Sequence, residues 1–501
     1  MNRHLGFLLS VATVGFLLQS CGPKWTSEEK GTFTLVHNKD GQTLGYSPSS
    51  GVNILTVGRY AFKDLNRNGE LDPYEDWRLS FDKRAADLAS QLSVEEIAGL
   101  MLYSSHQSIP SAGGGMFGGA TYAGKPFSES GASPGALSDQ QIKFLTEDNV
   151  RHVLITSVQT PATAAEWNNN AQALVEGTGH GIPVNTSSDP RHGSDIYAEY
   201  NAGAGGKISM WPGTVGLAAS FDPELMKQFG EIASQEYRAL GIATALSPQI
   251  DLATEPRWSR FEGTMGEDPV LAADMARAYV DGFQTSEGDF EISGGWGYHS
   301  VNAMVKHWPG GGPEEGGRDG HFGYGEYAVY PGNNLKDQLK PFINGAFKLS
   351  GPTGSASAVM PYYTISFGQD TVYGENVGNG YSKYIITDLL RGTYGYDGVV
   401  CTDWGVTGNV ESVDAFAGKC WGAEGLTIAE RHYKVIMAGV DQFGGNNDKQ
   451  PVLEAYNMGA EEFGEEFMRK RFEESAVRLL RNIFRTGLFE NPYLDTSETE
   501  K

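Results

Sequence analysis

Charged and aromatic residues at the ends of apolar runs are the part of this sequence that could do chemistry. Asp403 and Trp404 follow the short apolar run 399–401, which suits a strand buried on both faces of a parallel sheet. A carboxylate at the end of such a strand can act as a nucleophile, and the indole beside it offers a flat apolar face to a sugar ring. Taken alone, Asp403 has a simpler interpretation, as the cap of the next helix.

Other predicted strands end in residues of the same kinds. Asp189 follows the third strand, Arg260 the fourth, Lys306 and His307 close the fifth, and Tyr362 closes the sixth. Each of these has a structural explanation when taken singly, such as a turn or an ion pair. Five strand ends that face one rim with charged and aromatic groups are hard to explain in that way. A set of Asp, Arg, Lys and His suits the recognition of sugar hydroxyls.

Repeated strand–helix units would bring these residues together. From residue 81 onward, apolar strand-like runs alternate with amphipathic helical patterns, which is typical of βα units on a parallel sheet. The expected helices include 223–240, which Asp222 would cap, 269–284 and 383–390. Eight such units predict an α/β fold, the (β/α)8 TIM-type barrel. The expected strands are 99–104, 150–156, 182–187, 242–248, 303–306, 358–362, 399–402 and 440–443.

Composition narrows the class of ligand. The 501 residues have a formal net charge of -24, which argues against nucleic acid because phosphates need a basic surface. A neutral ligand such as a carbohydrate fits better. Nothing resembles a dinucleotide site, so no organic cofactor is expected. The glycine-rich run 113–119 lacks the lysine and the spacing of a phosphate loop, and it is predicted to be a mobile loop.

The first 21 residues are expected to direct export. An apolar run over residues 5–18 is too short to span a bilayer comfortably and is placed like a signal sequence. Its end resembles a bacterial lipoprotein cleavage site, with Cys21 as the lipidated residue. An ordinary secretory signal is the alternative. Both predict a location in the bacterial cell envelope, in the periplasm or at the outer membrane, with a lipid anchor as the only membrane attachment.

Residues 64–75 have the pattern of an EF-hand calcium loop. Oxygen-bearing side chains recur at the required spacing, and Gly69 supplies the sharp turn. We expect a structural Ca²⁺ that clasps the amino-terminal segment; the alternative is a polar turn before the next helix. The predicted ligands are Asp64, Asn66, Asn68, the carbonyl of Glu70, Asp72 and Glu75.

Several of these stretches resemble the signature segments of glycoside hydrolase family 3. They are Ser188-Asp189, PRWSR at 256–260, KHWPG at 306–310 and TDW at 402–404, and FRTGLFENP at 484–492 resembles the end of the family's barrel domain. The resemblance implies a retaining exo-β-glycosidase that hydrolyses terminal β-D-glucosyl or similar residues of oligosaccharides. It implies Asp403 as the nucleophile and Trp404 as part of the subsite wall. The terminal sugar would be bound by Asp189, Arg260, Lys306, His307 and Tyr362.

The resemblance leaves the acid/base open. Two-domain members take it from an α/β sandwich domain after the barrel, and this chain ends where that domain would begin, so we expect it outside this chain, in a separate domain or subunit. Single-domain members, the N-acetylglucosaminidases, use an Asp–His pair that Asp319 and His321 imitate. The alternatives are therefore a β-N-acetylhexosaminidase that uses this pair, and a non-catalytic glycan-binding lipoprotein.

The expected organisation has four parts. Residues 1–21 form the signal peptide, 22–80 an amino-terminal segment with the calcium loop, 81–490 the barrel, and 491–501 the start of a linker. A long amphipathic stretch, 461–488, is expected to pack against the end of the barrel.

Overall fold

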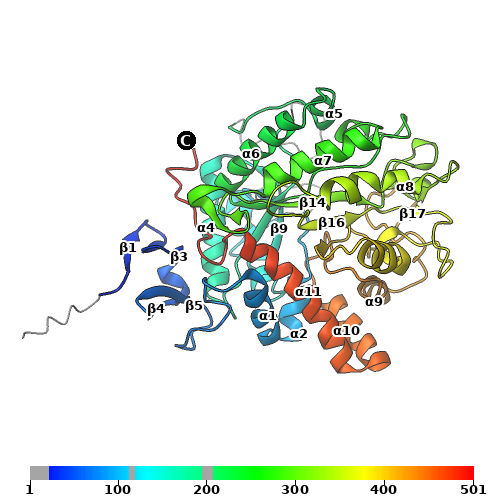
Figure 1. The fold of residues 1–501 in the computed structure, drawn as a ribbon. Helices are drawn as coiled ribbons and strands as arrows, with labels where there is room; N and C mark the ends of the chain where they lie inside the picture. Colours follow the sequence, from blue (N-terminus) through cyan, green and yellow to red (C-terminus); the bar gives the residue numbers. More distant parts are fainter. Residues whose placement is uncertain (1–21, 112–118, 194–206, 501) are drawn as a thin grey trace, which may run out of the picture.

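A computed structural model describes residues 22–111, 119–193 and 207–500 (Figure 1). The predicted signal peptide, Cys21 and most of the glycine-rich run 113–119 lie outside the described residues. Within them, none of the helices combines the length and the apolar character that crossing a bilayer requires.

A closed ring of parallel strands forms the centre of the molecule. The seven-stranded sheet has the order β18-β16-β14-β11-β10-β9-β6. Parallel bridges from Tyr103 to His152, from Leu102 to Phe443 and from Cys401 to Gln442 close it. The predicted TIM-type barrel is therefore confirmed. The eight strand positions of the barrel are residues 102–103, β9 (His152–Val158), β10 (Asn185–Ser188), β11 (Ile242–Ala245), β14 (Asn302–Trp308), β16 (Ala358–Pro361), β18 (Val399–Val400) and residues 442–443. An additional short strand, β6 (Gln107–Ile109), also pairs with β9.

Most strands follow from short apolar runs that can be buried on both faces, whereas β10 is buried although all four of its residues are polar. Every residue of β10, β11, β14, β16 and β18 is buried, as expected where helices cover a parallel sheet. The helices surround the ring (Figure 1). They are α1 (Phe81–Gln91), α2 (Val94–Leu100), α3 (Asp139–Thr146), α4 (Pro161–Glu176), α5 (Thr214–Ala218), α6 (Pro223–Ala239), α7 (Pro269–Gln284), α8 (Leu335–Gln338), α9 (Ile428–Ala438), α10 (Gln450–Phe463) and α11 (Glu465–Arg485), with π-helices η8 (Pro341–Ala346) and η10 (Tyr384–Thr393).

Helix starts were predictable where a capping residue precedes a proline. The Asp222 carboxylate accepts backbone N–H bonds at the start of α6, and Asp268 does the same for α7. Several boundaries differ from the prediction. The expected strand 182–187 begins only at Asn185, the expected strand 242–248 ends at Ala245, and 440–443 contributes only bridges at residues 442 and 443. Residues 99 and 100 belong to α2, and the segment 383–390 lies in a π-helix. The stretch 461–488 is divided between α10 and α11 at Gly464, whose φ of 93° only glycine adopts readily.

The amino-terminal segment is docked on the barrel through Glu176 of α4. This segment contains the sheet β1 (Trp25–Glu29), β2 (Thr34–Asn38) and β3 (Thr43–Tyr46) and the hairpin β4 (Asn53–Val57)–β5 (Tyr60–Asp64). The Glu176 carboxylate accepts the Ser47 backbone N–H at 2.8 Å and the Tyr493 hydroxyl at 2.7 Å, and it lies 3.4 Å from Lys63 Nζ. One buried carboxylate thus joins the first and last parts of the chain.

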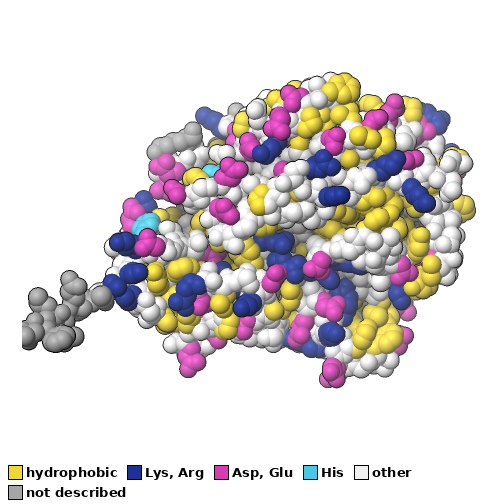
Figure 2. All heavy atoms as spheres, in the orientation of Figure 1, with side chains coloured by type: hydrophobic (Ala, Val, Ile, Leu, Met, Phe, Trp, Pro, Cys, Tyr) yellow, Lys and Arg dark blue, Asp and Glu magenta, His cyan; other side chains and the backbone are white. Residues whose placement is uncertain are grey.

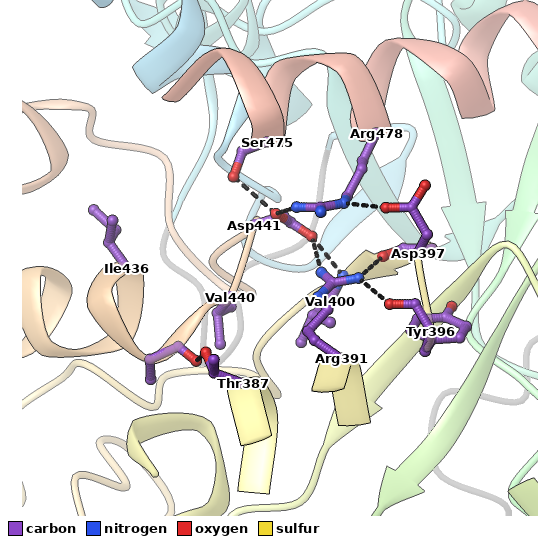
Figure 3. A network of polar contacts seen from close by, with 12 residues as sticks. Thr387, Arg391, Tyr396, Asp397, Val400, Ile436, Val440, Asp441, Ser475 and Arg478 are labelled. Carbon is purple, nitrogen blue, oxygen red and sulfur yellow. Dashed lines mark hydrogen bonds and ion pairs between the residues drawn. The ribbon is translucent and has the colours of Figure 1, made fainter. Parts of the chain in front are cut away.

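A second buried carboxylate, Asp441, ties the end of the ring to α11 (Figure 3). Its oxygens contact Arg391 Nη2 at 2.6 Å, Arg478 Nη1 at 3.1 Å and Ser475 Oγ at 2.8 Å. It also accepts the backbone N–H of Val400 in β18 at 3.0 Å. Because several donors surround Asp441, the free-energy cost of burying its charge is compensated. The same contacts fix the position of the last two barrel strands relative to α11.

The short strands lie in loops and hairpins outside the ring. They are β7 (Thr121–Tyr122), β8 (Lys125–Pro126), β12 (Glu291–Ser293), β13 (Trp296–Gly297), β15 (Tyr327–Ala328) and β17 (Ile365–Ser366).

Figure 2 shows acidic and basic side chains interspersed over one face of the molecule, so the excess negative charge is not gathered there.

Candidate active site

A cavity of about 500 Å³ lies at the carboxyl ends of the barrel strands. This is the rim at which TIM-barrel proteins place their chemistry. Most of the residues singled out from the sequence line it together, although they come from segments far apart in the chain. They are Asp189, Arg260, Lys306, His307, His321, Asp403 and Trp404. Asp319 and Tyr362 lie behind this lining.

Asp403 follows β18 and is almost entirely buried, at 6% exposed. Its Oδ1 accepts the backbone N–H of Trp404 at 2.8 Å. Its Oδ2 lies 3.7 Å from His307 Nε2 and has no hydrogen-bond partner among the residues that the structure describes. A carboxylate fixed on one side with one unengaged oxygen at a cavity is arranged to attack an electrophilic carbon.

The surroundings of Asp403 keep it ionised. Burial alone would raise its pKa, but the positive charges that His307 and His321 carry when protonated, and a hydrogen bond from Tyr363, lower the pKa below its ordinary value. The Tyr363 hydroxyl also accepts the Trp404 N–H at 3.2 Å. Tyr363 was not singled out from the sequence, yet it lines the cavity and holds the carboxylate, whereas its predicted neighbour Tyr362 does not line it.

His307 is oriented by Asp251, a fully buried residue that no local sequence signal identified. Asp251 accepts the His307 backbone N–H at 2.9 Å and lies 2.7 Å from His307 Nδ1. Burial lowers the pKa of His307 to about 4, although Asp251 opposes this shift. The ring is therefore neutral at pH 7, and with Nδ1–H donated to Asp251 its Nε2 is an acceptor, 3.3 Å from Arg260 Nη1.

Lys306 and Asp189 form a donor–acceptor pair at the cavity. Lys306 Nζ lies 3.1 Å from Asp189 Oδ1, and the side chains are 9% and 21% exposed. An ammonium group beside a carboxylate can bind adjacent hydroxyls of one sugar ring, since one group donates and the other accepts.

Asp319 and His321 form a second carboxylate–imidazole pair, and His321 lines the same cavity as Asp403. Asp319 Oδ1 lies 2.6 Å from His321 Nδ1 and accepts the His321 backbone N–H at 3.0 Å. Burial alone would raise the pKa of Asp319, but the hydrogen bond with His321 lowers it to about 2. A group that can carry a proton therefore faces the cavity.

Glu314 and Tyr362 lie in a buried polar layer beneath the cavity, at 2% and 1% exposed. Burial raises the pKa of Glu314 well above its ordinary value, and the nearby charge of Asp319 raises it further. The Tyr362 hydroxyl and the Gly320 N–H oppose this shift, but burial outweighs them, so the neutral form of Glu314 is favoured. The centroid of the Tyr362 ring lies 4.5 Å from that of His307, and Tyr362 is not among the residues that line the cavity.

The predicted calcium ligands lie in the loop between β5 and α1. Asp64 is buried; its Oδ2 accepts the Gly69 N–H at 3.1 Å and its Oδ1 has no partner among the described residues. The Asn66 and Asn68 amides both meet Asp72 Oδ2, at 2.6 and 2.8 Å. Because the amide oxygen and nitrogen can exchange places by a half turn, both side chains can present oxygens at this point.

Glu75 closes this loop from the other end. It accepts the backbone N–H groups of Leu65 at 2.7 Å and Asp72 at 3.1 Å. Burial raises its pKa to about 7. Within the described ranges, no three His, Cys, Asp or Glu side chains lie close enough together to hold a metal ion. The loop is held by its own hydrogen bonds. Its fit to Ca²⁺ rests on Asp64 and on the side-chain amides of Asn66 and Asn68.

The fold and the cavity place the protein in the class of TIM barrels with a charged, carboxylate-containing site at the carboxyl rim. The sequence model of the glycosyl hydrolase family 3 N-terminal domain matches residues 124–481. The chain belongs to this family, as the sequence motifs implied.

The similarity to individual proteins covers more of the chain than the match to the family model does. A periplasmic beta-glucosidase/beta-xylosidase from Dickeya chrysanthemi is 41% identical over 463 residues, which cover 89% of this chain and 65% of the relative. Beta-glucosidase C from Emericella nidulans is 36% identical over 439 residues, 87% of this chain and 63% of the relative. The chain thus spans just under two thirds of the length of these relatives.

Solved structures support the same fold. A β-glucosidase from Erythrobacter marinus superposes with a TM-score of 0.63 at 23% identity, covering 85% of this chain and 48% of that one. A family 3 β-N-acetylglucosaminidase from a Paenibacillus species gives a TM-score of 0.57 at 24% identity, with coverages of 79% and 63%.

Proposed function

We propose that this chain provides the sugar-binding and nucleophilic parts of a retaining exo-acting β-glycosidase, which removes terminal β-D-glucosyl or similar residues from oligosaccharides. The observation that carries this proposal is Asp403, an ionised, buried carboxylate with one unengaged oxygen in a cavity that also holds the Lys306–Asp189 pair. The names of the relatives from Dickeya chrysanthemi and Emericella nidulans support it.

The reaction would proceed by double displacement. Asp403 attacks the anomeric carbon while the bond to the leaving oxygen breaks and an acid gives that oxygen a proton. Water then attacks the glycosyl–Asp403 ester, gives its proton to the same group and restores the carboxylate. Lys306, Asp189 and the Nε2 acceptor of His307 would hold the hydroxyls of the terminal sugar, and Trp404 would cover its apolar face.

Our proposal places the acid/base outside this chain, in a separate α/β sandwich domain or subunit, on the resemblance to two-domain family members. A second candidate has a specific observation in its favour: Asp319 and His321, 2.6 Å apart, line or back the same cavity as Asp403. This candidate is a β-N-acetylhexosaminidase with its proton donor on this chain. A preference for aryl N-acetyl-β-glucosaminides over aryl β-glucosides, abolished in His321→Ala, would select it.

Covalent trapping tests the main proposal. An activated 2-deoxy-2-fluoro-β-D-glucoside should label the protein stoichiometrically, and peptide mass spectrometry should find the sugar on Asp403. The Asp403→Asn variant should stay unlabelled. A protein that binds glucose but is never labelled would instead be a non-catalytic glycan-binding lipoprotein.

We further propose that the protein is exported to the bacterial envelope and lipidated at Cys21. The apolar run 5–18 and the lipoprotein-like cleavage site support this proposal, as does the periplasmic relative. Metabolic labelling with a fatty acid should mark the wild-type protein and should fail for Cys21→Ala.

A structural Ca²⁺ at residues 64–75 is also proposed, because the buried Asp64 presents an unpartnered oxygen in the loop.

A further inference from the structure

A row of aromatic rings leads from the candidate active site to the surface. The His321 ring stacks on Phe416 with centroids 5.2 Å apart and planes at 7°. Phe322 meets Phe416 edge to face at 6.0 Å, and Tyr324 stacks on Phe322 at 5.2 Å and 10°. His321 and Phe416 line the cavity, whereas Tyr324 is 48% exposed. We call Phe416, Phe322 and Tyr324 the aromatic row.

The aromatic row begins at the cavity, which Phe416 lines, and continues through Phe322 to the exposed Tyr324. Asp189, Lys306 and Asp403 stand at the strand ends, at the base of the cavity. The row belongs to the loops that follow β14 and β18, which rise beyond those ends. In an exo-acting site the terminal sugar occupies the closed end, so the remainder of the substrate points toward these loops.

The row is held in place by contacts between its two loops. The Gly323 N–H donates to the Val413 carbonyl at 2.9 Å. The buried Lys419 ammonium lies 4.4 Å from the Phe416 ring centroid and donates to the Phe416 carbonyl. Because these contacts fix the rings before a ligand arrives, little conformational entropy is lost on binding.

The chemistry of the row favours an aromatic ligand. Phe322, Gly323, Tyr324 and Gly325 have one hydroxyl among their side chains, and the neighbouring Val413 is 60% exposed. A second sugar ring would need donors and acceptors for its hydroxyls, whereas a planar aromatic group needs only offset or edge contacts with other rings. We infer that the aromatic row is a leaving-group subsite that selects β-glycosides with planar aromatic aglycones. This inference rests on the proposed function.

Binding of thioglycosides, which are not hydrolysed, tests the inference separately from catalysis. In the wild-type protein, 2-naphthyl 1-thio-β-D-glucoside should bind about tenfold more tightly than methyl 1-thio-β-D-glucoside, as measured by calorimetry; tenfold corresponds to about 1.4 kcal/mol. Tyr324→Ala and Phe322→Leu should each remove most of this preference while the dissociation constant of the methyl compound stays the same. Tyr373→Ala, at a tyrosine 45% exposed outside the row, is the matched control.

The outcomes separate the two ideas. If neither thioglucoside binds, the proposed function fails. If both bind equally in the wild type, or the naphthyl preference survives in both variants, the aromatic row is not the subsite. A thio-linked disaccharide that binds more tightly than the naphthyl compound and is weakened by Tyr324→Ala would overturn the choice of an aromatic aglycone. Thermal melting of each variant shows whether it is folded, and Phe322→Leu keeps apolar volume in case Tyr324→Ala does not fold.

Discussion

At the scale of single residues, the pKa values of two buried carboxyl groups, Asp403 and Glu314, are shifted in opposite directions. The protonated forms of His307 and His321, together with a hydrogen bond from Tyr363, lower the pKa of Asp403 against the effect of burial, so the carboxylate is ionised at pH 7. At Glu314, burial and the charges of Asp319 and Asp251 raise the pKa well above its ordinary value, against the opposing effect of the Tyr362 hydroxyl and the Gly320 N–H. Opposite environments of this kind separate a group that can react as an anion from one that supports the site.

The first residue-scale prediction concerns Asp403. Asp403→Asn keeps the size and the hydrogen bond to the Trp404 N–H but removes the anionic oxygen. Turnover of aryl β-glucosides should fall by at least about 10³-fold, because no covalent intermediate can form. The melting temperature should hardly change. A variant that keeps wild-type activity would show that the nucleophile lies elsewhere.

The second concerns the neutral state of Glu314. Its pKa is higher in the folded than in the unfolded protein, so the folded protein binds more protons and its stability falls as pH rises from about 4.5 toward the folded pKa. If Glu314 binds its proton ten times more tightly in the folded than in the unfolded protein, the free energy of unfolding falls by about 1.4 kcal/mol over this rise in pH. Glu314→Gln cannot ionise, so its free energy of unfolding should exceed that of the wild type at pH 7 to 8, and the difference should vanish near pH 4.

Denaturant unfolding across this pH range measures the effect. The titratable groups that face Glu314 are Tyr362, Asp319 and Asp251. Glu315→Gln is the matched control, and its stability should be measured over the same pH range. That neighbour is half-exposed and paired with Arg318 at 3.1 Å, and its substitution should have no such pH dependence. A Glu314→Gln variant less stable than the wild type at pH 7 would mean that Glu314 is ionised and paired.

At the scale of elements, local sequence determines what could be predicted. The apolar runs gave the strands, and Asp222 before Pro223 gave the start of α6, since both signals act over a few residues. The division at Gly464 was missed because the amphipathic pattern continues across it. Asp251 and Tyr363 were missed because their roles depend on which strand ends meet around the ring, and nothing in the adjacent sequence encodes that.

Glu176 provides an element-scale prediction. Glu176→Ala removes the acceptor of Ser47 and Tyr493 and leaves Lys63 buried without its counter-charge. Breaking such a buried pair costs about 3–5 kcal/mol, so the denaturation midpoint should fall markedly. Lys63→Met with Glu176→Gln, which removes both charges, should recover part of the loss. If Glu176→Ala unfolds like the wild type, the amino-terminal segment is not docked through this carboxylate.

The calcium proposal is tested on the same segment. Chelation with EGTA should lower the melting temperature, because an ion bound only to the folded state stabilises it. Asp64→Ala and Asp72→Ala should melt at a lower temperature and should not respond to the chelator. An unchanged wild-type melting temperature in EGTA, with no calcium detected by elemental analysis, would leave residues 64–75 as a turn held by hydrogen bonds.

At the scale of the whole molecule, the closed ring alone fixes the groups to which we assign sugar binding and nucleophilic attack. Asp403, Lys306 and Asp189 stand on strand ends that the closed ring fixes. The proton donor need only reach the open side of the cavity, where the loops after β14 and β18 project. A site divided in this way would keep its first chemical step even when the donor is absent.

The last prediction follows from that division. If the acid/base lies outside this chain, as we propose, the 501-residue protein should release activated phenols from aryl β-glucosides, which need no proton on the leaving oxygen. It should barely hydrolyse disaccharides, whose departing alkoxide is far more basic. The second step also lacks its base, so stopped-flow traces should show a burst of phenol, then slow turnover that azide accelerates. Brisk disaccharide hydrolysis without a burst would contradict this and place the donor on the chain; disaccharide activity should then disappear in His321→Ala.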